Sequence, residues 1–342
     1  MSRQKLLPVM TILVLIAAGI GGYGWFSHQR SPQSPGPVEK LTLGTDKSLF
    51  SSPIWIAEHQ GYFRDAGLEV TLKEFPTGKL ALQTLLQGEP LDIVTVASTP
   101  IMLQSFGRDD FRILATFVDS QDNDRVIANK ARGIATVTDL QGKKLGYVKG
   151  TSAHFLLEIL LVEHGLVPAQ VELVDLKPVD VPKALADQHV DAIAMWEPYA
   201  MQALALLQER GVQLSPPGTY RATYNFVAMQ DFIDKRQHAV TRLLTAIDRT
   251  HQLISDQRET AQTIVADRLQ MDRAVVAQLW EKFSYRLFLD QLFLLDLESQ
   301  ARWAIKSHLT DKTVVPNYLH LVSFDGLQRV KPKAVTLVLP RN

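Results

Sequence analysis

Short apolar runs of strand type alternate with segments of helical periodicity from Lys40 onward, and few folds accommodate that alternation. The segments 68–75 and 91–97 have the composition of strands, whereas the apolar residues of 79–87 recur at helical spacing. Strands that alternate with helices usually pair in parallel, because each crossover helix returns the chain to the same end of the sheet. The sequence therefore predicts an α/β fold in which parallel or mixed sheets are flanked by helices. A crossing into a second lobe is expected at 126–135, a mostly helical stretch at 231–309 and an irregular tail at 311–339.

The segment Lys144–Leu161, KLGYVKGTSAHFLLEILL, contains the clearest strand–turn–helix unit. A strand-type run from Leu145 is broken by Gly150, and Thr151 and Ser152 then precede a helical pattern. Threonine and serine are favoured N-caps, and the start of a helix carries unpaired N–H groups and partial positive charge. The pattern is typical of an anion-binding turn, although an ordinary capped helix that binds nothing has the same sequence.

Three predicted helices begin directly after strands with paired hydroxyl residues, and a Thr-Gly turn provides a fourth, weaker case. The pairs are Ser51 and Ser52, Ser98 and Thr99, and Thr151 and Ser152; the turn is Thr77-Gly78. In an open parallel sheet, ligands bind at the carboxyl ends of the strands, where such helix starts converge. We therefore predict a polar cleft for an anionic group, the alternative being that these residues serve only as helix caps.

Trp196 and Glu197 end another predicted strand and are expected to face the same cleft. Trp196 is suited to cover an apolar part of a ligand or a cation, and Glu197 is suited to pair with a ligand amine. The alternatives are packing between lobes for Trp196 and a structural salt bridge for Glu197. His154 lies in the first turn of its helix and is either a hydrogen-bond donor to the ligand or an ordinary surface histidine.

The composition argues against several other functions. The chain of 342 residues has 36 basic and 36 acidic residues and no cysteine. A balanced charge argues against a nucleic-acid partner, and the lack of cysteine excludes disulfides, Cys-zinc sites and cysteine nucleophiles. The sequence contains no HExxH pair, P-loop or nucleophile elbow. We therefore predict a protein that is not an enzyme and has no metal or cofactor, and its length predicts two lobes.

The N-terminal region is predicted to lie outside the folded part. Arg3 and Lys5 precede an uncharged run, Leu6–Phe26, whose 21 residues suffice to cross a bilayer. Basic residues before such a run keep the N-terminus in the cytoplasm and place the remainder outside. We predict an uncleaved membrane anchor at 1–26, with a cleaved signal peptide as the alternative, followed by a tether rich in proline and serine at 27–39.

Several segments together resemble a known family. They are PIWIAEHQGYFRDAGLEVTLKEFPTG, LQGEPLDIVTVASTP, VTDLQGKKLGYVKGTSAHFLL, VDAIAMWEPY and PNYLHLVSFDGLQRVKPKAV, and they are spread over residues 40–335. In this order they are similar to the periplasmic substrate-binding proteins of ABC importers for nitrate, sulfonate and taurine-type ligands. The resemblance implies the periplasmic binding protein fold with a ligand cleft between two lobes, one formed by 40–127 and 219–342 and the other by 128–218.

The resemblance also implies the residues of the cleft and the partners. The implied ligand-binding residues are Ser48, Ser51, Ser52, Pro53, Thr77, Gly78, Ser98, Thr99, Thr151, Ser152, His154, Trp196 and Glu197. The implied ligand is a small oxyanion, with an organic sulfonate of the taurine or alkanesulfonate type favoured over nitrate, bicarbonate or a thiamine-precursor pyrimidine. The implied partners are ABC permease and ATPase subunits, and the protein would lie in the periplasm, anchored to the inner membrane by its N-terminal segment. The alternative role is a membrane-tethered receptor domain that senses its ligand.

Overall fold

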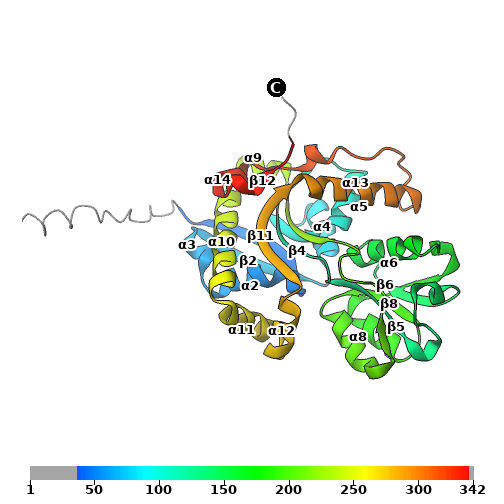
Figure 1. Cartoon of the computed structure of the whole chain (residues 1–342). Helices are drawn as coiled ribbons and strands as arrows, with labels where there is room; N and C mark the ends of the chain where they lie inside the picture. The colour runs from blue at the N-terminus through cyan, green and yellow to red at the C-terminus, as the bar shows by residue number, and fades with distance from the viewer. Residues whose placement is uncertain (1–36, 339–342) are drawn as a thin grey trace, which may run out of the picture. The chain divides into compact units, whose positions relative to one another are not determined.

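The computed structural model describes residues 37–338, so the predicted anchor and nearly all of the predicted tether lie outside the described residues. Within that range, no helix combines the length and the apolar character needed to span a bilayer. The chain from Val38 onward forms one compact unit. Its strands form two sheets, each flanked by helices, as the prediction of an α/β fold requires (Figure 1).

Seven strands form the larger sheet, in the order β12-β11-β4-β10-β3-β1-β2. Their bounds are β1 Glu39–Asp46, β2 Leu68–Phe75, β3 Ile93–Ala97, β4 Phe111–Ser120, β10 Ala222–Met229, β11 Phe283–Asp290 and β12 Val335–Thr336. β1 pairs in parallel with β2 and β3, whereas β10 is antiparallel to β3 and β4. The sheet is therefore mixed, because the chain leaves it after β4 and re-enters it through β10.

Five strands form the smaller sheet, in the order β7-β6-β8-β5-β9. Their bounds are β5 Asp124–Asn129, β6 Lys144–Tyr147, β7 Glu172–Asp175, β8 Ala192–Trp196 and β9 Gly211–Gln213. β6 is parallel to β7 and β8, and β5 is antiparallel to β8 and β9. Because β6 and β8 are parallel, their carboxyl ends lie at the same edge of the sheet. This edge carries the site described below.

Each sheet has its own hydrophobic core, and we refer to a sheet with its helices as a lobe. The helices of the first lobe are α2 Ser52–His59, α3 Tyr62–Asp65, α4 Gly78–Leu86, α5 Ser98–Ser105, α9 Gln230–Lys235, α10 Gln237–Asp256, α11 Arg258–Leu269, α12 Arg273–Trp280, α13 Gln291–Lys306 and α14 Asp325–Val330. Those of the second lobe are α6 Ser152–Glu163, α7 Val181–Ala186 and α8 Tyr199–Leu207. The described chain therefore contains the two lobes that its length predicts.

The chain passes between the lobes twice, at 121–123 and at 214–221. These two crossings contact each other, because the Gly218 N–H donates a hydrogen bond to the Gln121 carbonyl at 2.8 Å. Tyr220 lies in the second crossing and packs against both cores. The pair of crossings is the natural position for a hinge.

The structure differs from the sequence-based prediction in three places. The segment from Val126 was expected to be a crossing, but it belongs to β5, which starts at Asp124 inside the smaller sheet. Residues 231–309 were expected to be mostly helical, but β11 interrupts them and pairs with β4. β12, at Val335–Thr336, lies in the tail that was expected to be irregular. In each case pairing with a distant strand decides the conformation, and such a partner cannot be inferred from local periodicity.

Candidate ligand-binding site

A pocket lies between the two lobes, where strands of both sheets end. It has a volume of about 30 Å³, which is room for very few water molecules. Its lining residues are Asp46, Ser48, Phe50, Thr77, Gly78, Ala97, Pro100 and Tyr224 from the first lobe, Thr151, Ser152 and Trp196 from the second, and Asn123 from the crossing. Of the residues predicted to bind ligand, Ser48, Thr77, Gly78, Thr151, Ser152 and Trp196 line it. The expected convergence of strand ends and helix starts is therefore present.

A carboxylate of the protein itself, that of Asp46, occupies the start of α4. Its Oδ1 accepts hydrogen bonds from the Ser48 N–H at 3.2 Å, the Ser48 hydroxyl at 2.8 Å and the Ser51 hydroxyl at 3.1 Å. Its Oδ2 accepts from the Gly78 N–H at 3.1 Å and from the Tyr224 hydroxyl. Asp46 therefore takes the donors that Ser48, Ser51 and Gly78 were expected to offer to a ligand oxyanion.

The remaining residue of this turn, Thr77, caps α4. Its hydroxyl oxygen accepts a hydrogen bond from the Leu80 N–H at 3.1 Å, which is the usual arrangement at a helix N-cap. Thr77 therefore has the capping role that the sequence left open as the alternative, although it also forms part of the pocket wall.

Gly78 is packed so closely that a larger residue would displace backbone, and we predict a large effect of Gly78→Ala. A Cβ at this position would lie 2.5 Å from the Tyr224 hydroxyl oxygen, 2.7 Å from the Thr95 carbonyl oxygen and 2.9 Å from Val96 Cα. We expect the substitution to lower the free energy of unfolding by about 1–3 kcal/mol, measured by urea denaturation. Gly107→Ala is the control, because a Cβ at Gly107 meets no atom within 4 Å. Equal effects of the two substitutions would contradict the prediction.

The hydroxyl at the start of α2 is directed into the protein. Ser52 Oγ donates to the Leu49 carbonyl at 2.6 Å. Ser52 and Pro53 are buried in the first turn of α2, and neither lines the pocket. The structure thus places both residues behind the wall that Ser48 and Phe50 present to the pocket.

The two hydroxyls at the start of α5 are also used within the first lobe. Ser98 Oγ lies 3.0 Å from the Tyr220 hydroxyl and accepts from Gln300 Nε2 at 3.0 Å. Thr99 Oγ1 donates to Gln300 Oε1 at 2.7 Å. These contacts join α5 to α13 and to the second crossing, and neither Ser98 nor Thr99 lines the pocket.

The start of α6 lies at the pocket, and no side chain caps its first N–H groups. Gly150 has a φ of +72°, which turns the chain sharply between β6 and the helix. Thr151 is the N-cap residue, but its hydroxyl donates to the Val148 carbonyl at 2.8 Å and does not cap the helix. Because the first turn of a helix has N–H groups without intrahelical partners, α6 offers such donors beside Thr151 and Ser152. This is the position that suits an anionic group.

An apolar wall also lines the pocket. Trp196, at the end of β8, is 8% exposed and lines the pocket together with Phe50 and Pro100. Its ring packs edge to face against Tyr199, with centroids 6.1 Å apart. The pocket therefore combines hydrogen-bond donors with an aromatic surface, a combination that is common in small-molecule sites.

His154 does not line the pocket; it belongs to a buried hydrogen-bond cluster. Its Nδ1 accepts from the Gly150 N–H at 3.2 Å, so Nε2 carries the proton and donates to Glu158 Oε1 at 3.0 Å. Glu158 Oε2 accepts from Trp303 Nε1 at 2.8 Å and from Ser307 Oγ at 2.5 Å. Since Trp303 and Ser307 belong to the first lobe, Glu158 fastens α6 to α13 across the two lobes.

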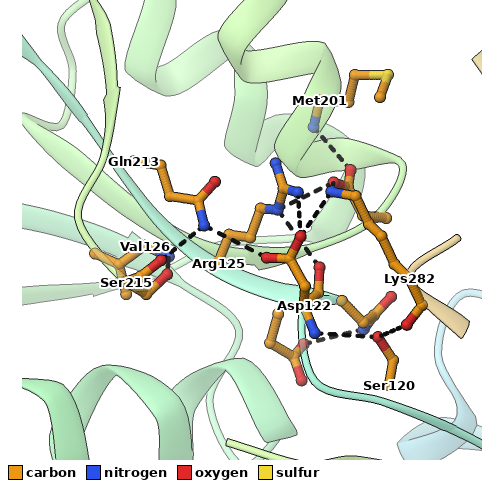
Figure 2. Close-up of polar contacts among 11 residues, drawn as sticks. Ser120, Asp122, Arg125, Val126, Met201, Gln213, Ser215 and Lys282 are labelled. Atoms are coloured by element: carbon orange, nitrogen blue, oxygen red, sulfur yellow. Dashed lines mark hydrogen bonds and ion pairs between the residues drawn. The ribbon is translucent and has the colours of Figure 1, made fainter. Parts of the chain in front are cut away.

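Glu197 also makes contacts between the lobes and lies outside the pocket. It is fully buried, and its carboxylate pairs with Arg125 at 3.3 Å and with Lys282 at 3.1 Å while accepting from the Met201 N–H at 2.9 Å. Figure 2 shows the side chains of Arg125 and Lys282 directed at Asp122, to which both also pair. Burial raises the pKa of Glu197 to about 7, although Arg125 acts in the opposite direction. Glu197 thus has the structural salt bridge that the sequence left open as the alternative.

Six pocket residues were absent from the prediction. Three are apolar, namely Phe50, Ala97 and Pro100, and three are polar, namely Asp46, Asn123 and Tyr224. Asp46 ends the first strand and precedes the serine-rich loop, so its position at a strand end was a usable signal for the edge that carries the site. Asn123 lies in a crossing, and Tyr224 comes from a strand that enters the sheet about a hundred residues after β4 ends. Local sequence patterns carry no information on either placement.

The two mixed sheets with a pocket between them define the class of the fold, which is that of two-lobed periplasmic binding proteins. The crystal structure of the periplasmic aliphatic sulphonate binding protein SsuA from Escherichia coli matches with a TM-score of 0.70 and 23% identity, covering 83% of this chain and 97% of that one. The alkanesulfonate-binding protein SsuA from Xanthomonas axonopodis pv. citri, bound to MOPS, matches with a TM-score of 0.70 and 20% identity, covering 88% and 99%.

Residues 50–261 match the family described as NMT1/THI5 like, and the chain belongs to this family. A Bacillus subtilis (strain 168) protein named for the binding of aliphatic sulfonates is 25% identical over 283 residues, which are 80% of this chain and 81% of that protein. The resemblance to binding proteins of this kind, noted from the sequence segments, is confirmed.

Proposed function

We propose that this protein is the extracytoplasmic solute-binding component of an ABC importer and that it captures an organic sulfonate. The observation that carries the proposal is the uncapped start of α6, which presents N–H donors to a pocket that both lobes line. The names of the B. subtilis relative and of the two solved structures, all of which refer to sulfonates, support the ligand class. The partners would be a permease and an ATPase subunit, and the site would bind its ligand without transforming it.

The apolar wall supports an organic ligand over an inorganic one. Trp196 and Phe50 line the pocket with aromatic surface. Nitrate and bicarbonate have no apolar part that could pack against this surface. The pocket also contains the Asp46 carboxylate, whereas none of its described lining residues is a lysine, arginine or histidine. A small anion would therefore have only backbone N–H groups and neutral polar side chains to bind to. We also propose that the protein lies in the periplasm and is held at the membrane by its N-terminal segment. The alternative role is a receptor domain that is held at the membrane and senses its ligand.

A thermal-shift panel tests the ligand class. At about 100 times its dissociation constant a ligand stabilises by about 2.7 kcal/mol, so we expect a sulfonate to raise the melting temperature by several degrees. The panel contains taurine, ethanesulfonate, an aromatic sulfonate, nitrate, bicarbonate and an aminopyrimidine. A shift with nitrate or bicarbonate and none with any sulfonate would show that the proposed ligand class is wrong.

The same panel, run on variants, tests the position of the anionic group. We expect Ser152→Ala to reduce the shift, because Ser152 begins α6 and lines the pocket. Thr263→Ala is the control, because Thr263 is an exposed hydroxyl residue on α11. An unchanged shift in both Ser152→Ala and Thr151→Ala would remove these two side chains from the site.

A further inference from the structure

Two buried oxygen atoms beside the pocket have no hydrogen-bond partner among residues 37–338. They are Asn123 Oδ1 and Asp124 Oδ2. Asn123 is 1% exposed and lines the pocket, and Asp124 is 8% exposed and begins β5. Buried polar atoms are nearly always paired in native proteins, because an unpaired one costs the free energy of its lost hydration. Both atoms are acceptors, so the partner that they lack is a hydrogen-bond donor.

The neighbouring cations do not fill this role. Arg125 and Lys282 pair with Asp122 and Glu197, as described above, and neither forms an ion pair with Asp124. Burial raises the pKa of Asp124 to about 7, and Ser152 and Asn123 offset that effect only in part. Among these acidic side chains, Asp124 is thus the one that lacks a positive partner within the described chain.

The two acceptors lie next to the position assigned to the anionic group. Ser152 connects them, since its hydroxyl lowers the pKa of Asp124 and its backbone begins α6. Asn123 and Ser152 both line the pocket. A short ligand with an anion at one end and a donor at the other would therefore match the α6 donors and the two free acceptors together.

We propose that the ligand carries an amine in addition to its anionic group and that Asn123 Oδ1 and the Asp124 carboxylate bind this amine. The inference rests on the proposed function, because it assigns a second contact within the same ligand. It also moves the amine contact from Glu197, where the sequence placed it, to two residues with unpaired oxygens. An ammonium group supplies three donors and a positive charge, which is what the two acceptors lack.

Two ligand pairs that differ only in the amine test the proposal. Taurine is compared with ethanesulfonate, and β-alanine with propionate, by calorimetry on the full chain and on Asp124→Asn, Asn123→Ala and the control Asp311→Asn. Asp311 is exposed and lies in the first lobe away from the pocket lining. We expect the amine to improve affinity at least tenfold, since a charge-assisted hydrogen bond has about that effect. We expect this advantage to be lost in Asp124→Asn, reduced in Asn123→Ala and kept in the control.

The outcomes separate the inference from the proposed function. If ethanesulfonate binds as tightly as taurine, the amine contact is refuted while sulfonate binding stands. If neither sulfonate binds but β-alanine exceeds propionate in an Asp124-dependent manner, the sulfonate proposal fails and the amine contact stands. An amine advantage that survives both Asp124→Asn and Asn123→Ala would assign the amine to other residues and refute the inference.

Discussion

Replacement of Asp46 by alanine is expected to lower the free energy of unfolding by about 3 kcal/mol or more. The substitution removes the acceptor for the Gly78 N–H, the Tyr224 hydroxyl, and the donors of Ser48 and Ser51. Each buried donor that is left unpaired costs about 1–3 kcal/mol, although the hydroxyls can turn to other partners. Urea denaturation followed by circular dichroism measures the loss.

Two controls make the Asp46 experiment specific. Asp65→Ala removes an exposed carboxylate that pairs with Arg249 at 2.6 Å, and an exposed pair of this kind is worth about 0–1 kcal/mol. Formate should restore part of the melting temperature of Asp46→Ala, because it can occupy the space of the carboxylate and accept the same hydrogen bonds. If the Asp46→Ala protein were as stable as Asp65→Ala, or if formate did not raise its melting temperature, these hydrogen bonds would contribute little.

Glu158→Gln is expected to loosen the contact between the lobes. The glutamine amide has one acceptor oxygen where the glutamate has two. At least one of the three donors, on His154, Trp303 and Ser307, would therefore meet the amide N–H₂ group. We expect a loss of about 1–3 kcal/mol for the unpaired donor. We also expect a larger radius of gyration of the ligand-free protein in small-angle X-ray scattering, because Glu158 joins α6 to α13.

The effect of Glu158→Gln should depend on pH. Burial raises the pKa of the Glu158 carboxyl, but the hydrogen bonds from His154 and Ser307 outweigh it, so the folded-state pKa lies below its ordinary value of 4.5. A carboxylate with a lowered pKa stabilises the fold above its unfolded-state pKa, and this stabilisation is lost as pH falls through the folded-state value. The difference between Glu158→Gln and the parent should therefore be full near pH 7 and decrease below about pH 4.5.

The control for this experiment lies on the same helix. Glu163→Gln changes an exposed glutamate at the end of α6. It should leave both the unfolding free energy and the radius of gyration unchanged. A Glu158→Gln protein with the scattering profile of this control would show that Glu158 does not hold the lobes together.

Local sequence patterns predicted most of the strands and the helix starts of the pocket. β2 and the start of α6 were predicted at the positions that the structure gives them, because their signals lie within a few neighbouring residues. The direction of each hydroxyl was not predictable in this way. Ser98 and Thr99 turn toward Gln300, which lies 201 residues beyond Thr99 in the chain. Likewise, the Asp46 carboxylate accepts a hydrogen bond at the start of α4, where the local sequence gives no sign of a partner within the protein.

Asn123 and Asp46, whose side chains line the pocket, also show what local sequence cannot predict. Each lies at the junction of a strand with a loop, where a polar residue is ordinary in sequence. Their importance depends on burial and on the donors around them, which are set by packing between the lobes. Sequence reasoning could name the edge of the sheet that carries the site, and it could not assign the polar groups there to ligand or to protein.

The discontinuous first lobe has a consequence for the order in which the chain assembles. Both neighbours of β4 in the larger sheet, β10 and β11, come from the part of the chain beyond Ala222, whereas the strands of the second lobe all lie between Asp124 and Gln213. The second lobe can therefore form from contiguous chain, while β4 keeps two unpaired edges until the later strands arrive. Unpaired edges of a buried strand are sites of aggregation. An early intermediate of this protein should thus contain a folded second lobe beside an open sheet that a chaperone would have to protect.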